Sequence, residues 1–214
     1  MTATRQDRGP RRRWSYAEFA RLPSDDGNRY EVIAGELHVT PSPRPLHQTI
    51  VARLDRLLGG FVERHGLGWV APGPIDVLFA EGDYLAPDLV FVRRERMGIV
   101  SERGLERAPD LVVEVLSGST AGRDRGIKRE RYARYGVPEY WVVDPKARRI
   151  EVCRQGEGPD RSKADSDHTA AGDGRTAGYL EGPDIVEDVL TWRPGPDGPE
   201  LEIPVPHLMR SIDR

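Results

Sequence analysis

Apolar residues repeat along the chain at two different periods, and the clearest repeat is helical. From Leu46 to Val62 they recur at steps of three and four residues, which is the spacing of an amphipathic α-helix. A shorter helix is predicted to begin after Ser15, because Ser15 and Glu18 have the spacing of a capping box. It should end near Pro23, since proline rarely continues a helix.

Short apolar or alternating runs bounded by turn-forming residues predict the strands. The run at residues 111–116 reads LVVEVL, and such a near-continuous apolar segment is typical of a strand covered on both faces. A polar helix is expected between residues 120 and 135, and a final strand with a short tail helix after residue 185. The predicted strands lie at residues 30–33, 36–40, 68–71, 75–79, 84–92, 111–116, 139–144 and 149–153, the first two joined as a hairpin. This order of helices and strands indicates an α/β or α+β fold.

The length of 214 residues favours one folded domain, which we place at residues 14–214. Residues 1–13 carry five arginines and no apolar period, so we expect a disordered basic arm there. Residues 155–178 contain no Leu, Ile, Val, Met or aromatic residue, and we expect a mobile polar loop in that range. The single cysteine, Cys153, excludes an intramolecular disulfide and favours a reducing compartment.

The chain has no apolar run long enough to cross a bilayer, and its basic amino terminus lacks the apolar segment of a secretory signal. We therefore expect a soluble, cytoplasmic protein with no membrane partner. The formal net charge is −3, so no global positive field indicates a nucleic-acid partner. The charge is uneven, however, because residues 121–135 hold five arginines and one lysine against two acids.

One acidic residue interrupts the most apolar predicted strand. Glu114 stands between Val113 and Val115. An ionised carboxylate removed from water without a partner costs several kcal/mol, so Glu114 must be ion-paired, hydrogen-bonded, protonated or bound to a metal. Carboxylates in such surroundings concentrate at functional sites. A buried salt bridge with an arginine explains Glu114 equally well.

A second acidic residue, Asp88, follows Pro87 and precedes the apolar run at residues 89–92. Proline favours extended backbone, so Asp88 is expected at the start of a strand. Alone, such an aspartate is more often a turn or edge residue than a ligand. Together, Asp88 and Glu114 on neighbouring strands offer the oxygen ligands that a hard divalent cation takes. A cation of this kind neutralises charge on a phosphate and activates water.

A lysine near the attacking water would complete such a site, and Lys128 is the candidate. It lies on the helix that follows the strand of Glu114, and Asp124, Lys128 and Tyr132 are spaced four residues apart, so they share one helical face. The alternative is an ordinary Asp–Lys pair on a solvated surface. His47 lies on the apolar face of the long helix, and Glu31 is an acid inside an apolar strand; both are further candidates for lining the site.

The amino-acid sequence around these residues resembles that of a known family. Pro87 and Asp88, followed after 26 residues by Glu114 in an apolar strand, resemble the PD-(D/E)XK nuclease superfamily. Several longer segments together look like the Uma-type family of putative restriction endonucleases within it. These segments are YEVIAGEL at 30–37, PRPLHQTIVARL at 43–54, PDLVFV at 87–92, APDLVVEVLSGST at 108–120, the Asp-Lys-Tyr spacing at 124–132 and GVPEYWVVDP at 136–145.

The resemblance implies a restriction-endonuclease-like core, an α/β (α+β mixed) fold in which a mixed β-sheet is flanked by helices and preceded by an amino-terminal helix and hairpin. It implies that Asp88 and Glu114, with the main-chain oxygen of Val115, hold Mg²⁺, or Mn²⁺ in its place. The superfamily's lysine stands two residues after the glutamate, where this chain has Leu116, so the resemblance assigns that role to Lys128. It also places Glu31 and His47 at site-lining positions.

We therefore predict a Mg²⁺-dependent endonuclease that hydrolyses phosphodiester bonds in DNA, with Asp88, Glu114 and Lys128 as its catalytic residues and Asp124 and Tyr132 lining the site. A homodimer or higher homo-oligomer is expected, because cutting two strands usually needs two sites; the sheet edges and residues 136–145 are candidate interfaces. The alternative is a catalytically inactive nuclease-like module that binds nucleic acid or a protein partner. Candidate contacts to DNA phosphates are Arg123, Arg125, Arg129, Arg131 and Arg134.

Overall fold

The computed structural model describes residues 13–23, 26–80, 82–118, 120–156, 178–195 and 197–211. Nearly all of the expected basic arm and polar loop lies outside these residues. The helical segments are α1 (Tyr16–Phe19), α2 (Pro45–His65), the 3₁₀ segment η1 (Arg94–Ile99), α3 (Ala121–Arg123), the π-type segment η2 (Asp124–Lys128), α4 (Arg129–Arg134) and α5 (Val205–Leu208). The strands are β1 (Asn28–Ile33), β2 (Glu36–Pro41), β3 (Gly68–Pro72), β4 (Val77–Ala80), β5 (Asp83–Leu85), β6 (Leu89–Arg93), β7 (Val100–Ser101), β8 (Gly104–Leu105), β9 (Leu111–Val115), β10 (Glu139–Asp144), β11 (Arg149–Gly156), β12 (Tyr179–Val186), β13 (Val189–Trp192) and β14 (Leu201–Pro204).

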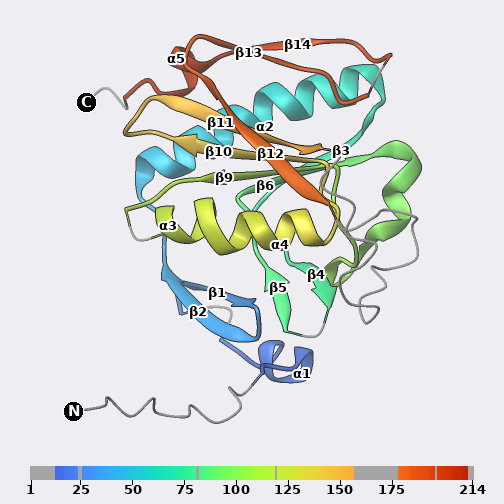
Figure 1. The fold of residues 1–214 in the computed structure, drawn as a ribbon, viewed down its shortest axis with the longest axis vertical. Coiled ribbons are helices and arrows are strands. Elements are labelled where there is room, and N and C mark those ends of the chain that lie inside the picture. The colour runs from blue at the N-terminus through green and yellow to red at the C-terminus, as the bar shows by residue number, and fades with distance from the viewer. Residues whose placement is uncertain are drawn as a thin grey trace, which may run out of the picture.

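Two six-stranded sheets form the framework, in the orders β12-β11-β10-β9-β6-β3 and β2-β1-β5-β4-β8-β7, and β13 pairs with β14. The first sheet is mixed, because β9 and β10 run parallel while its other pairs are antiparallel. Figure 1 shows α2, with the β13–β14 pair beyond it, on one side of this sheet and α4 on the other. The fold is therefore a mixed α/β structure with helix-flanked sheets, an amino-terminal helix and a hairpin, as the sequence predicts.

Strand β9 is buried on both faces, and its side chains alternate between two cores. Leu111, Val113 and Val115 pack with the apolar face of α2, whereas Val112 packs with the residues around α4. Because side chains alternate along a strand, Glu114 points to the same side as Val112. The period-2 pattern thus directs one carboxylate toward the helix that carries Lys128.

Helix α2 extends slightly beyond the predicted period of Leu46 to Val62, and residues suited to helix ends lie at both of its boundaries. Pro45 occupies the first turn, where the missing N–H costs nothing, and Gly66 closes the helix with a positive φ of 61°. Its buried residues include Ile50, Leu54 and Leu58, which pack against the sheet. His47 lies in the first turn of α2 and is buried, so the helix holds this side chain in place.

The strand predicted at residues 84–92 is wrong as a single element. The structure divides it into β5 and β6, which belong to different sheets. Pro87 has no N–H to donate, and the N–H of Ala86 donates to the side chain of Glu31 at 3.0 Å instead of to a strand. The chain therefore crosses between the sheets at residues 86–88, and this crossing holds Asp88.

The helix predicted between residues 120 and 135 is interrupted by the wide turn of η2. Gly126, inside this turn, has non-helical angles of φ −104° and ψ −107°. Single π-type turns of this kind often occur at functional sites. Here Asp124 and Lys128 lie at the two ends of the turn, and both side chains are buried.

Two further expectations need correction. The end of the chain forms three strands, β12, β13 and β14, where one was predicted, and β11 extends to Gly156, into the range expected to be a loop. Residues 136–145, a candidate interface, consist mostly of β10, which lies between β9 and β11 and is almost wholly buried. Among the described helices, none is long and apolar enough to span a membrane.

Candidate functional site

Four carboxylates gather where β9 ends beside β1, the first turn of α2 and the η2 turn. They come from β1 (Glu31), the crossing between the sheets (Asp88), β9 (Glu114) and η2 (Asp124), and all four side chains are buried. Each of these residues was a sequence-based candidate. The structure brings all of them together with His47, Lys128 and Tyr132.

Asp88 is held by three donors. Arg29 donates from Nη1 to Oδ1 at 2.7 Å, while His47 Nε2 at 3.1 Å and the main-chain N–H of Val115 at 2.7 Å both contact Oδ2. Burial opposes ionisation of Asp88, but the hydrogen bond from His47 and the charge of Arg29 outweigh it and lower the pKa of this carboxyl. Asp88 is therefore a buried anion at neutral pH.

Glu114 lies in the opposite electrostatic situation. Its Oε1 accepts hydrogen bonds from Lys128 Nζ at 2.7 Å and from the Tyr132 hydroxyl at 2.9 Å. Burial nevertheless raises the pKa of Glu114 to about 8, because the nearby charges of Asp124 and Asp88 offset part of the attraction of Lys128. Burial therefore favours the protonated form of Glu114, and the contact with Lys128 opposes it.

Lys128 is shared among three carboxylates. Its Nζ lies 2.7 Å from Glu31 Oε1, 2.7 Å from Glu114 Oε1 and 3.7 Å from Asp124 Oδ1. Burial lowers the pKa of Lys128, but the attraction of the three carboxylates is greater, so the net effect raises it above its ordinary value. The surface Asp–Lys pair considered from sequence is thereby excluded, since the Lys128 side chain is only 2 % exposed.

Asp88 and Glu114 lie on adjacent segments of the chain. Leu89 pairs with Val113 in the antiparallel β6–β9 register, and Asp88 and Glu114 are the next residues along the two segments. Asp88 lies just outside β6, and its charge interacts with that of Glu114. The hydrogen bond from the Val115 N–H to Asp88 shows that the main chain of β9 also lies against this carboxylate.

The donor set fits a cation that takes few protein ligands. Within the described ranges, no group of three or more acidic, histidine or cysteine side chains is arranged to hold a metal ion. Mg²⁺ is commonly bound by one or two carboxylates and keeps several waters. The pair of Asp88 and Glu114 meets that requirement, although protein cations now contact both carboxylates.

The five candidate arginines divide into two groups. Arg125 pairs with Asp144 at 2.6 Å and with Glu151 at 2.8 Å, and Arg129 donates to two main-chain oxygens of β12. These two side chains therefore fasten helix to sheet. Arg123 lies 3.9 Å from Glu31, Arg131 lies 3.5 Å from Asp83, and Arg134 is partly exposed on α4.

Arg29 is the site residue that the sequence analysis missed. It precedes Glu31 by two positions on β1, and residues two apart on a strand share a face. That period was the available signal, because Glu31 was already a candidate. What the sequence could not supply is the long-range contact, since Arg29 and Asp88 are 59 residues apart in the chain.

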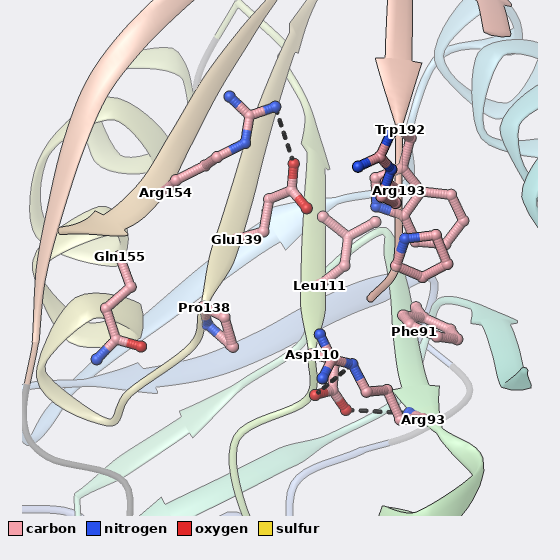
Figure 2. A pocket seen from close by; sticks show the side chains of 11 residues that line it. Phe91, Arg93, Asp110, Leu111, Pro138, Glu139, Arg154, Gln155, Trp192 and Arg193 are labelled. Carbon is pink, nitrogen blue, oxygen red and sulfur yellow. Dashed lines mark hydrogen bonds and ion pairs between the residues drawn. The ribbon is translucent and has the colours of Figure 1, made fainter. Parts of the chain in front are cut away.

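A cavity of about 420 Å³ lies at the opposite end of the same sheet and contains none of the predicted site residues. Figure 2 shows Glu139, Leu111 and Phe91 rising from neighbouring strands, with Trp192 and Arg193 beside them. Its acids are paired with arginines: Asp110 with Arg93 and Arg96, and Glu139 with Arg154. The cavity is therefore a separate feature from the carboxylate cluster.

Comparisons with known proteins identify the family and the fold. The model of a family described as Uma2, putative restriction endonuclease, matches residues 16–172, well over half of the chain. The chain is also similar to the crystal structure of a putative nuclease belonging to DUF820 from Anabaena variabilis, with a TM-score of 0.58 and 20% sequence identity over 66% of this chain and 79% of that one. At that identity the likeness concerns the fold. No curated protein matches the chain.

Proposed function

Because the chain belongs to the Uma2 family of putative restriction endonucleases, we propose that it is a Mg²⁺-dependent nuclease that hydrolyses phosphodiester bonds in DNA at the carboxylate cluster. The observation that carries the proposal is the meeting of Asp88, Glu114 and Lys128, from three separate parts of the chain, at one buried point. Burying three carboxylates around one lysine, with a fourth beside them, is expensive for folding. Such an arrangement is expected where chemistry requires it.

Asp88, Glu114 and the main-chain oxygen of Val115 would hold the cation, with Mn²⁺ as a substitute for Mg²⁺. Support for Val115 comes from its N–H, which already lies against Asp88 Oδ2. When bound, the cation would neutralise charge developing on the phosphate and make water a stronger nucleophile. It would also favour the ionised form of Glu114, whose pKa is raised to about 8 without it.

Lys128 would orient the attacking water and stabilise negative charge. A lysine whose pKa is raised keeps its proton at neutral pH, so it is a hydrogen-bond donor in the reaction and not the base that removes a proton from water. The contacts to Glu31 and Glu114 hold its ammonium group in place. Tyr132 supports Glu114 from the same helix face, and His47 supports Asp88.

Arg123, Arg131 and Arg134 are the arginines that we retain as contacts to DNA phosphates. Arg123 and Arg131 make long ion pairs with Glu31 and Asp83, at 3.9 and 3.5 Å, and Arg123 also donates a 3.4 Å hydrogen bond to Thr40. Phosphate is a strong partner for a guanidinium group. Arg125 and Arg129 are not part of the proposal, because they are bound within the fold. Cutting both strands of DNA would use two copies of the chain, as a homodimer or higher homo-oligomer.

The test is cleavage of supercoiled plasmid in Mg²⁺ or Mn²⁺ by the wild type and by Asp88→Asn, Glu114→Gln and Lys128→Met, each checked for folding by circular dichroism. We expect metal-dependent nicking by the wild type and a loss of at least about 100-fold in each variant, the usual size of an effect on acid–base and electrostatic groups. Glu139→Gln, which alters a buried carboxylate at the other end of the sheet, is the matched control and should cleave like the wild type.

The second candidate function is an inactive nuclease-like module, and one observation favours it. Arg29 and Lys128 already contact the two carboxylates that would hold the metal. Absence of cleavage by the folded wild type in both metals, together with retained binding of a labelled DNA duplex, would replace the nuclease proposal by this one.

A further inference from the structure

We propose that Arg29 is a resident counter-ion of the metal-free site, and that a divalent cation binds by taking Asp88 from it. This inference rests on the proposed function, because it concerns the same metal site. It adds a residue that sets how tightly the site binds metal.

The contacts of Asp88 identify Arg29 as the competing cation. Oδ2 is engaged by His47 and by the main-chain N–H of Val115, whereas among the described residues the hydrogen-bond partner of Oδ1 is Arg29 Nη1, at 2.7 Å. A metal ligated by Oδ1 would therefore share that oxygen with the guanidinium group. Two cations on one oxygen repel each other strongly at such short range.

The position of Arg29 among the other acids supports the same conclusion. Its charge interacts with those of Asp88, Glu114 and Glu31, so it neutralises the two carboxylates that the proposed metal would use. Asp88 and its acidic neighbours lie close to both Arg29 and Lys128, so the site attracts positive charge. A divalent ion that displaced Arg29 would replace one positive charge with two in the same acidic surroundings.

Arg29 and Lys128 differ in their ability to leave. The Arg29 side chain is 22 % exposed and extends from β1, whereas Lys128 is 2 % exposed and lies within reach of three carboxylates. A guanidinium group at the surface can turn into water or toward a phosphate, because it is only weakly hydrated and retains its charge. The divalent cation therefore displaces Arg29, and Lys128 stays in the cluster.

The test is calorimetric titration of Mn²⁺ into the folded wild type, Arg29→Met and Arg29→Lys, without DNA. Removing a charged hydrogen bond that competes with the metal should lower the Kd for Mn²⁺ about tenfold in Arg29→Met. Arg29→Lys keeps the charge and should lie between the two proteins. Arg123→Gln is the matched control, because it removes an arginine near Glu31 that does not contact Asp88; we expect less than about a threefold change there.

The outcomes separate this inference from the function on which it rests. Equal or weaker Mn²⁺ binding by Arg29→Met, with binding abolished by Asp88→Asn in both backgrounds, would overturn the role of Arg29 and leave the metal site standing. Weaker binding would mean that Arg29 positions Asp88 for the metal, and equal binding that Arg29 has no influence on the site. No Asp88-dependent binding in either protein would overturn both. Urea unfolding of each variant identifies any change in affinity that comes from a loss of folded protein.

Discussion

Acidic residues lie near both ends of strands β9 and β10, and they are paired with positive charge differently at the two ends. Near the beginning of the strands, Asp110 accepts hydrogen bonds from the Arg93 main chain at 3.0 Å and from Arg96 at 2.8 Å, and Glu139 accepts one from the Trp141 indole at 2.9 Å. Near the end of β9, Glu114 shares its lysine with Glu31 and Asp124. One end provides a cation or donor for each acid, and the other crowds three acids around one cation.

This difference indicates which end of strands β9 and β10 is arranged for stability alone. Pairing each carboxylate with its own arginine, as in the cavity of Figure 2, satisfies charge without concentrating it. Burial, together with the neighbouring carboxylates, raises the pKa of Glu114, and Lys128 is the lysine that these acids share. Proteins depart from locally favourable arrangements mainly at functional sites. The crowded end is therefore the one to which we assign binding of a cation.

The largest expected effect is on Lys128. Lys128→Met leaves Glu31, Glu114 and Asp124 buried without their shared ammonium group, and breaking a buried pair in this way costs about 3–5 kcal/mol. Urea unfolding at pH 8 measures the change in the free energy of unfolding. Arg154→Met, at the other end, removes a side chain that is 48 % exposed and should cost less than about 1 kcal/mol. Similar losses in both variants would contradict the contrast between the two ends.

The next effect is on pH dependence. The pKa of Glu114 is about 8 in the folded chain and about 4.3 in an unfolded one, so between these values the folded protein holds a proton that the unfolded chain has released. Stability from this group therefore falls as the pH rises through that window, by at most about 1.4 kcal/mol per pH unit. Glu114→Gln should flatten the fall, as followed by urea unfolding at pH 5, 6 and 7.

Glu139→Gln is the control for this pH profile. Burial also raises the pKa of Glu139, but the Trp141 indole and Arg154 oppose the shift, so its replacement should change the slope in the same direction and by less. A larger change for Glu139→Gln than for Glu114→Gln would reverse our assignment of the crowded end.

The smallest expected effect tests whether charge or neutral hydrogen bonding holds the cluster. Tyr132→Phe removes the hydroxyl that donates to Glu114 Oε1 and should lower the free energy of unfolding by about 1 kcal/mol at pH 7. Tyr140→Phe, which removes a buried hydroxyl bound to the main-chain oxygen of Asp124, should cost a similar amount. If Tyr132→Phe proved as damaging as Lys128→Met, the cluster would depend on hydrogen bonding more than on charge.

Local sequence patterns predicted a helix or strand well where a single short-range period specifies that element. The three- and four-residue period specified α2, and alternation with a tight turn specified the β1–β2 hairpin. The same patterns failed at residues 84–92, because an apolar run cannot tell one strand from two strands in different sheets. They also missed the interruption at Gly126, since helical spacing continues on both sides of it.

The sequence by itself determined the chemistry of the candidate site. Asp88, Glu114 and Lys128 were recognisable because a carboxylate in a buried strand, and a lysine on the next helix, need a physical reason to be there. Their resemblance to a nuclease family gave that reason, and the family match agrees with it. The residue types and their faces were fixed by periods of two and of about 3.6 residues.

Only the tertiary structure decided which charges meet. It paired Arg29 with Asp88, shared Lys128 among three acids, and drew Arg125 and Arg129 into contacts within the fold. Periodicity gives the direction of a side chain but not its partner, because the partner comes from a segment distant in the chain. The strength of each charge then depends on burial and on every neighbour at once, and folding alone determines both.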